Sequence, residues 1–125
     1  MGGTSGILLE IFFTAAARCV AEGKSLPLAL VAGEHAIEFY GGAVVGDRTL
    51  LDALHPALEA LCAGKSLSSV AAAARLGADA TKTMTASAGR ANWVGQESYA
   101  GVPDPGAAAV AIVLEAVAAA DSLSA

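Results

Sequence analysis

The sequence predicts an all-helical fold. Alanine is abundant, aromatic residues make up only 5% of the 125 residues, and β-branched residues do not alternate with polar ones as they would in strands. Hydrophobic residues account for 55% of the chain and charged residues for 15%, which excludes intrinsic disorder. A chain of this length is expected to form one domain, or part of one.

A first helix is expected from Ile7 to about Ala21, with Gly23 behind it as its C-terminal cap. Its polar side chains recur every four residues and form one narrow stripe, so the helix is expected to be buried on most sides. The stripe comprises Glu10, Thr14 and Arg18.

A second helix is expected after Ser25, because Pro27 falls in its first turn and Gly41-Gly42 ends the helical pattern. One face of this helix is predicted to be apolar. It comprises Leu28, Val31, Ala32, His35 and Phe39.

A third helix follows Gly46-Asp47-Arg48-Thr49, because Thr49 and Asp52 have the spacing of a capping box. Its apolar stripe is predicted to comprise Leu50, Leu51, Leu54, Leu58 and Leu61. Pro56 falls inside this pattern and removes one backbone hydrogen bond, so a kink is expected near Leu51 and Asp52 rather than a break.

The last two helices are expected from a Ser66 cap to about Ala88, and from Asp104 to about Asp121. Asp104 has the place of an N-cap, and Pro105 has the first helical position. Between them the stretch from Gly89 to Pro103 is the least regular in the chain, and polar and aromatic residues gather there.

Charge and spacing exclude several classes of function. The net charge of -5 disfavours nucleic acid and anionic lipid as partners. Charged residues interrupt each apolar stretch before about 18 residues, so no membrane span is expected, and no signal peptide is evident. Cys19 and Cys62 lack metal-binding spacing and are expected to be buried thiols in a reducing compartment, which predicts a cytoplasmic protein.

Three glycine-containing helix starts, at residues 2–6, 41–49 and 104–106, are predicted to present free backbone N–H groups to an anion. For any one of them taken alone, an ordinary helix cap is the simpler explanation, because caps of this kind are general. Arg90 is suited either to a phosphate or to the last carbonyls of its own helix. His35 and His55 lack ligand spacing and are expected to be structural or solvated. Neither a P-loop nor a dinucleotide-binding motif is present.

Four ordered motifs resemble the nucleotide-binding L domain of dihydroxyacetone kinases. They are Met1-Gly2-Gly3-Thr4-Ser5-Gly6, Gly46-Asp47-Arg48-Thr49-Leu50-Leu51-Asp52-Ala53-Leu54, Ala88-Gly89-Arg90-Ala91 and Pro103-Asp104-Pro105-Gly106-Ala107. The resemblance covers essentially the whole chain. It implies a barrel of antiparallel amphipathic helices whose loops at one end hold ATP or ADP with Mg²⁺.

The resemblance also implies a set of nucleotide-binding residues. Thr4 and Ser5 match positions that face the phosphates, Gly41, Thr49 and Leu50 match the wall around base and ribose, Arg90 matches the arginine after the glycine, and Asp104, Pro105 and Gly106 match the loop that closes the site. In this family an aspartate-rich loop upstream of the Gly-Gly-Thr-Ser-Gly segment holds the metal. The resemblance therefore implies no metal ligand and no catalytic residue in this chain.

Residues 1–125 are accordingly expected to be a single, incomplete L domain, inactive alone, of an ATP-dependent dihydroxyacetone (glycerone) kinase. Its partners are expected to be the nucleotide and a K domain that holds dihydroxyacetone or a related short sugar. Faces that include Phe12, Phe13 and Val20 are expected to lack partners, so a homo-oligomer is expected. The alternative is a non-catalytic helical module with a regulatory or assembly role.

Overall fold

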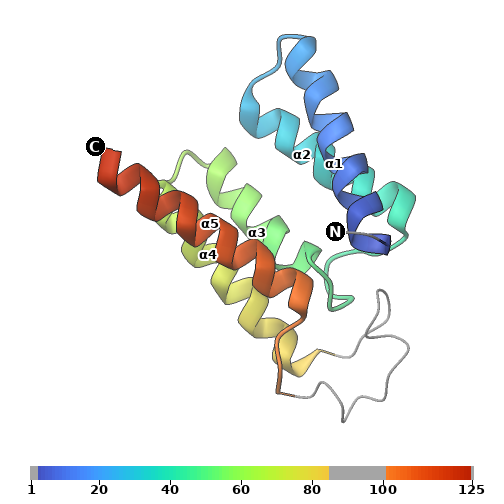
Figure 1. The fold of residues 1–125 in the computed structure, drawn as a ribbon, viewed down its shortest axis with the longest axis vertical. Helices are drawn as coiled ribbons and strands as arrows, with labels where there is room; N and C mark the ends of the chain where they lie inside the picture. The colour runs from blue at the N-terminus through green and yellow to red at the C-terminus, as the bar shows by residue number, and fades with distance from the viewer. Residues whose placement is uncertain (1–2, 85–100, 125) are drawn as a thin grey trace. The chain divides into compact units, whose positions relative to one another are not determined.

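The computed structural model describes residues 3–84 and 101–124, and these residues form helices joined by short loops (Figure 1). The helices are α1 (Gly3–Ala21), α2 (Leu26–Gly41), α3 (Leu51–Cys62), α4 (Leu67–Ala80), the 3₁₀ turn η1 (Thr81–Thr83) and α5 (Pro105–Ser124). The all-helical prediction is confirmed. The chain divides into two compact units, Met1–Val44 and Val45–Ala125.

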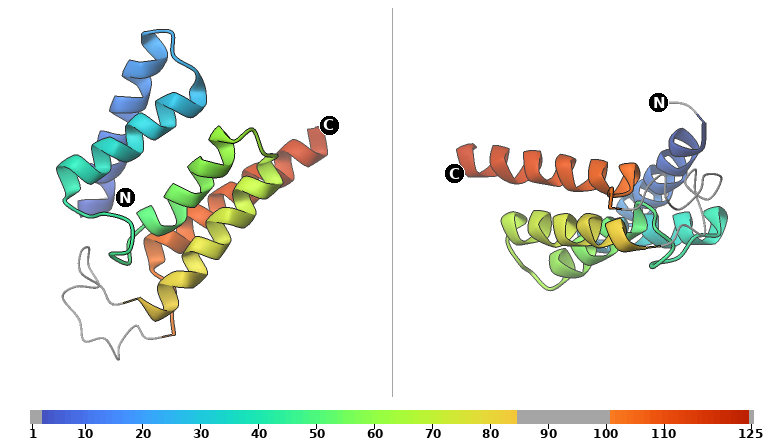
Figure 2. Two further views of the ribbon diagram at one scale, coloured as in Figure 1. Left: turned by 180° about the vertical axis from the view of Figure 1, so that it is seen from behind. Right: turned by 90° about the horizontal axis from the view of Figure 1, so that it is seen from below.

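The N-terminal unit is an antiparallel pair of helices, α1 and α2 (Figures 1 and 2). α1 begins at Gly3, ahead of the predicted Ile7. It ends as predicted, because Gly23 has a φ of 84° and donates its N–H to the carbonyl of Val20 at 3.0 Å. The predicted limits of α2 are also confirmed, since the Ser25 hydroxyl caps its first turn and Gly42, at φ 75°, follows its last residue.

Packing in this unit differs from the sequence prediction. A Cβ on Gly33 would lie 2.7 Å from the Phe12 ring, so this glycine lets the two helices approach closely. Phe12 is therefore buried, contrary to expectation, whereas Phe13 and Val20 are 61% and 51% exposed. The prediction that α1 is buried on most sides is wrong, because within the described part of this unit it packs against one helix and buries one face.

The predicted apolar face of α2 is also wrong. Leu28, His35 and Phe39 are exposed, and Phe39 is 80% exposed. The buried residues of α2 are Ala29, Gly33, Glu34 and Ile37. The contact with α1 uses Ala29, Gly33 and Ile37 instead, and the missing side chain at Gly33 makes room for the Phe12 ring.

In the C-terminal unit, α4 lies between α3 and α5 (Figure 2). Its core consists mainly of alanines: Ala53, Ala57, Ala60, Val70, Ala74, Ala78, Ala107 and Ala111. The predicted leucine stripe of α3 is buried only in part, at Leu51 and Leu58, because alanines form the face that meets α4.

The contact between α3 and α4 is closest at Gly77, where a Cβ would lie 2.0 Å from the carbonyl oxygen of Asp52. Pro56 has no N–H to give to this carbonyl, so one hydrogen bond of α3 is missing there. A Cα hydrogen of Gly77 faces the oxygen instead. The kink expected near Asp52 remains a prediction.

α4 ends at Ala80, eight residues before the predicted Ala88. The chain tightens into η1 because the Thr81 hydroxyl bonds to the carbonyl of Ala78 at 2.5 Å. The Thr81 carbonyl accepts in turn from Met84 N–H and from the Arg48 side chain. A helix can end early when side chains and tertiary contacts take its last carbonyls. Residues 85–88, the rest of the predicted helix, lie outside the described residues.

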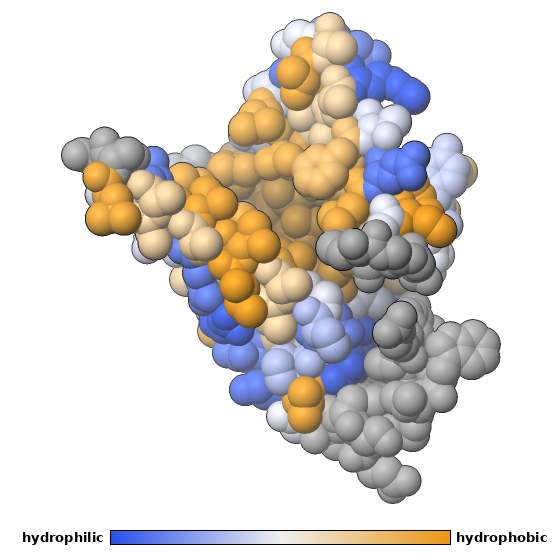
Figure 3. Space-filling model, in the orientation of Figure 1, coloured by the Kyte–Doolittle hydropathy of each residue, from blue (hydrophilic) through white to orange (hydrophobic). Residues whose placement is uncertain are grey.

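α5 begins as predicted and continues to Ser124, three residues beyond the predicted Asp121. It packs against α4 through Ala107 and Ala111, and Glu115 forms a bidentate pair with Arg75 of α4, with contacts of 3.0 and 2.7 Å. Ile112, Val113, Val117 and Leu123 of α5 are apolar and exposed. Hydrophobic colour follows the face of α5 that Figure 3 shows.

Two expectations drawn from the sequence meet a different finding in the structure. Pro105–Leu123 has a mean hydropathy of 1.7 despite Glu115, so by length and composition alone this helix could cross a membrane; a single helix of this kind is weak evidence for a span. The cysteines are not buried as expected: Cys19 is half-buried and Cys62, the last residue of α3, is exposed.

Candidate functional site

The Arg48 side chain joins three segments of the C-terminal unit that are far apart in the sequence. It is 1% exposed. Its Nε donates to the carbonyl of Thr81 at 3.1 Å, and its Nη2 donates to the carbonyl of Val102 at 2.5 Å. Its Nη1 lies 3.6 Å from Oδ1 of Asp104. A planar guanidinium can serve several acceptors at once, so Arg48 connects the start of α3, the end of α4 and the start of α5.

The Asp52 carboxylate organises the loop before α3. Its Oδ1 accepts the N–H of Gly46 at 2.6 Å, and its Oδ2 accepts the N–H of Thr49 at 2.9 Å. The Thr49 hydroxyl accepts the N–H of Leu51 at 3.3 Å. The predicted pairing of Thr49 with Asp52 is confirmed, although the threonine hydroxyl caps Leu51 rather than Asp52.

Asp104 caps α5, as the sequence predicts. Its Oδ2 accepts the N–H of Ala107 at 3.0 Å, and its own N–H donates to the buried hydroxyl of Thr81 at 2.8 Å. Burial raises the pKa of the Asp104 carboxyl above its ordinary value, against the opposite effects of the helix N–H groups and of Arg48. The carboxylate thus lies between its arginine partner and the positive end of α5.

The structure brings together the predicted nucleotide-binding residues of the C-terminal unit. These are Thr49, Leu50, Asp104, Pro105 and Gly106. A Cβ on Gly106 would lie 3.3 Å from Cβ of Leu50 and 3.2 Å from Oδ2 of Asp104. The absence of a side chain at Gly106 therefore lets the start of α5 lie directly against Leu50.

The other predicted residues belong to the N-terminal unit or lie outside the described residues. Thr4 and Ser5 belong to the first turn of α1, and Gly41 is the last residue of α2. They share one end of the antiparallel pair, since a Cβ on Gly41 would lie 3.2 Å from the side chain of Leu8. Arg90 lies outside the described residues.

Two of the three predicted anion-binding helix starts have their backbone N–H groups occupied. Asp52 takes those of Gly46 and Thr49, and Asp104 takes those of Gly106 and Ala107. At these two starts the ordinary helix cap is therefore confirmed over the anion site, because an acidic side chain occupies donors that a phosphate would use. The third start opens α1, whose first turn contains no acidic residue.

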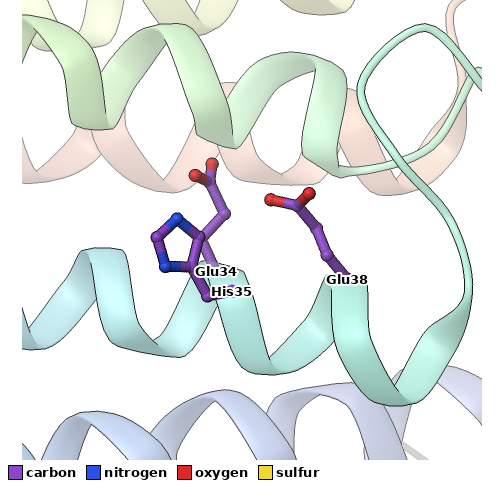
Figure 4. Close-up of side chains that lie close together, drawn as sticks. All are labelled: Glu34, His35 and Glu38. Atoms are coloured by element: carbon purple, nitrogen blue, oxygen red, sulfur yellow. The ribbon is translucent and has the colours of Figure 1, made fainter.

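The side chains of Glu34, His35 and Glu38 gather on α2, with ligand atoms within 4.8 Å of one another (Figure 4). An imidazole beside carboxylates suits transition metals better than Mg²⁺, which prefers oxygen ligands. Exposed His35 agrees with the solvated role expected of it, and His55 lies 3.5 Å from Glu59 on the next turn. The cluster therefore does not fit the magnesium of a nucleotide.

The carboxylates of Asp52 and Asp104 do not fit magnesium either. Both oxygens of Asp52 accept backbone N–H groups, and Asp104 faces the Arg48 guanidinium, which repels a second cation. The polar stripe predicted on α1 lines a groove. Glu10, Thr14 and Arg18 lie along an open groove of about 400 Å³, together with Tyr40 of α2.

Sequence reasoning gave no role to Arg48 and did not select Thr81. Arg48 lies inside the Gly46–Leu54 motif, so a signal was present, yet nothing in the sequence shows that its side chain turns inward. Thr81 follows a long alanine-rich helix without any local mark. The hydrogen-bond partners of Arg48 lie 33 and 54 residues away along the chain, so its role depends on how the helices pack.

Comparison with known proteins gives concordant matches. The DAK2 domain model matches residues 1–119. The dihydroxyacetone kinase of Citrobacter freundii is 47% identical over 120 residues, which are 94% of this chain and 22% of that protein. The triokinase/FMN cyclase of Homo sapiens is 42% identical over 128 residues, with the same two coverages.

A solved structure matches as well. The crystal structure of the dihydroxyacetone kinase from C. freundii in complex with AMP-PNP and Mg²⁺ has a TM-score of 0.77 and 41% identity, and the match covers 96% of this chain and 20% of that chain. The chain therefore spans about a fifth of the length of the relatives it matches.

Proposed function

This chain belongs to the DAK2 domain family, and from this we propose that it is the nucleotide-binding L domain of a larger kinase that phosphorylates dihydroxyacetone or a related short sugar. The observation that carries the proposal is the match, over 96% of the chain at 41% identity, to a kinase structure that contains AMP-PNP and Mg²⁺. The family resemblance noted in the four motifs is confirmed.

The contact between Leu50 and Gly106 supports a binding surface for the base and ribose. An apolar side chain beside a residue without one offers a flat surface that suits a purine ring. We assign Thr49 to the same wall and Asp104-Pro105-Gly106 to the loop that closes it, and we propose Gly41 as a nucleotide-binding residue from the family resemblance alone.

From the family resemblance we assign the phosphates to Thr4 and Ser5 at the start of α1, together with Arg90. At the starts of α3 and α5, Asp52 and Asp104 accept backbone N–H groups that a phosphate would otherwise use. Hydroxyl groups and the positive end of a helix dipole favour an anion there.

Phosphoryl transfer requires metal ions that neutralise charge on the phosphates. The carboxylates of Asp52 and Asp104 and the Glu34–His35–Glu38 cluster do not fit Mg²⁺, and the family resemblance implies an aspartate-rich loop upstream as the metal site. We therefore propose that the Mg²⁺ ligands lie in sequence beyond this chain, and we expect the isolated chain to be inactive. We propose that this chain binds and orients the nucleotide. The phosphate donor is then ATP rather than a phosphotransfer protein.

The remaining proposals concern partners and location. A K domain of the same kinase would hold the sugar. Exposed apolar side chains such as Phe13 and Ile112 provide surface for a neighbouring domain or for a second copy of the chain. We propose a cytoplasmic homo-oligomer.

The proposal is tested in the full-length protein that carries this chain. Ser5→Ala is expected to raise the KM for ATP a few-fold and Arg90→Ala by about tenfold or more, as expected for losing a neutral and a charged hydrogen bond. Ser66→Ala and Arg75→Ala are the matched controls, because they remove the same groups from the α4 cap and from the α4–α5 surface. A KM for ATP that neither site variant changes would refute the site.

The alternative, a helical regulatory or assembly module without catalysis, is favoured by one observation. The helix starts capped by Asp52 and Asp104 leave fewer donors for phosphate than the motifs suggest. This module would bind no ATP in the full-length protein, even with saturating Mg²⁺, and calorimetry measures that directly.

A further inference from the structure

Arg48 has a backbone conformation that disfavours it. Its φ is 62°, in the left-handed region that glycine adopts at no steric cost, and it is the one residue other than glycine with a positive φ among the described residues. Strain of this kind persists only where surrounding contacts compensate for it. The compensation here comes from the side chain, which is almost fully buried.

The buried guanidinium acts on the segment that leads into α5. Among the described residues, four contacts join residues 101–104 to other parts of the unit. Two come from Arg48, to the carbonyl of Val102 and to the carboxylate of Asp104. The others are the N–H of Gly101 on the carbonyl of Lys82 and the N–H of Asp104 on the hydroxyl of Thr81.

The hydrogen bond between the Asp104 N–H and the Thr81 hydroxyl also depends on Arg48. Nε of Arg48 donates to the carbonyl of Thr81, so the same guanidinium holds the residue whose hydroxyl receives the Asp104 N–H. A lysine could replace one of these contacts but not all, because an ammonium lacks the planar arrangement of donors.

We propose that Arg48 is a positioning residue for the nucleotide: it fixes residues 101–104 and thereby sets Asp104-Pro105-Gly106 against Leu50, where we have assigned the base and ribose. The inference rests on the proposed function. It goes further by assigning a role to Arg48, which holds the loop that closes the site in place without contacting the nucleotide.

The test uses the full-length kinase with three single variants, and with Asp104→Asn alone and combined with Arg48→Gly. Arg48→Lys keeps the charge, Arg48→Gly keeps the backbone conformation and removes the side chain, and Arg75→Met is the control. Arg75 also links α4 to α5 through two hydrogen bonds to a carboxylate, but far along the helices from the nucleotide loop. KM for ATP, KM for dihydroxyacetone, kcat and Tm are measured for each.

Both Arg48 variants are expected to raise the KM for ATP on the order of tenfold to a hundredfold, because small displacements of binding groups have effects of that size. The KM for dihydroxyacetone should not change, and Arg75→Met should leave both constants as in the wild type. Arg48→Gly in combination with Asp104→Asn should raise the KM for ATP less than the product of the two single effects, since both act through one loop.

The outcomes separate the two proposals. A wild-type protein without affinity for ATP refutes the proposed function. A wild type that binds ATP, with Arg48 variants that have a lower Tm or a smaller active fraction but an unchanged KM for ATP, shows a purely structural arginine and overturns this inference alone. If Arg48→Gly does not fold, the KM of Arg48→Lys decides by the same criterion.

Discussion

Replacing Gly77 by alanine tests whether the close contact of α3 and α4 controls stability. Intrinsic helix preference alone predicts that Gly77→Ala stabilises the chain by up to about 1 kcal/mol. The structure predicts the opposite, because the new Cβ would lie 2.0 Å from the carbonyl oxygen of Asp52 and 3.0 Å from Cα of Ala53. Both are backbone atoms, so no side-chain rotation can relieve the clash.

The size of the effect follows from the displacement required. Real Cβ contacts are essentially never shorter than 3.0 Å, so α4 must move by roughly 1 Å away from α3. Ala53, Ala74 and Ala78 around this contact are completely buried and would lose dispersion contacts with their neighbours. Overpacking of this kind costs about 1–3 kcal/mol, and we expect Gly77→Ala to destabilise the chain by that amount.

Equilibrium urea unfolding followed by circular dichroism measures the change. Ala72→Gly is the matched control, because Ala72 is exposed on the same helix and reports the intrinsic preference alone. It should destabilise by about 0.8–1.0 kcal/mol. If Gly77→Ala raises the free energy of unfolding, or leaves it unchanged, the helices are not in contact as described and the reasoning fails.

Two further predictions concern the acidic caps. Asp52→Asn keeps one acceptor oxygen but loses the second and the charge, so it should destabilise the chain by about 1.5–3 kcal/mol in the same unfolding assay; a loss below about 0.5 kcal/mol would contradict the loop structure. Burial raises the pKa of Asp104 above its ordinary value, so its contribution to stability is fully present below the ordinary aspartate pKa and is lost as pH rises through the folded pKa. Asp104→Asn should remove this decline from the pH profile of stability, and an unaltered profile would show that Asp104 is not the group responsible.

The sequence predicted helix limits well wherever the capping contacts are local. Ser25 bonds to an N–H three residues later, and Asp104 does the same with Ala107. The Schellman turn at Gly23 and the left-handed Gly42 also involve only neighbouring residues. Such contacts depend on residue types a few positions apart, so they can be read before any helix is placed beside another.

The candidate site was predictable only in outline. Leu50 and Gly106 were selected from separate motifs, and the structure places them in contact. The free N–H groups predicted beside them are occupied, because the acidic residues that mark a helix start also cap it. Motif order thus identified the segments, but not which of their atoms remain available to a ligand.

The sequence by itself determined the helical class, the starts of the capped helices and the family. Only the tertiary structure decided which faces are buried, that α4 ends at Ala80, and that Arg48 turns inward to Thr81, Val102 and Asp104. The physical reason is the range of the interactions. Caps and composition act over a few residues, whereas burial depends on how the helices pack, and the hydrogen bonds of Arg48 reach residues 33 and 54 positions away along the chain.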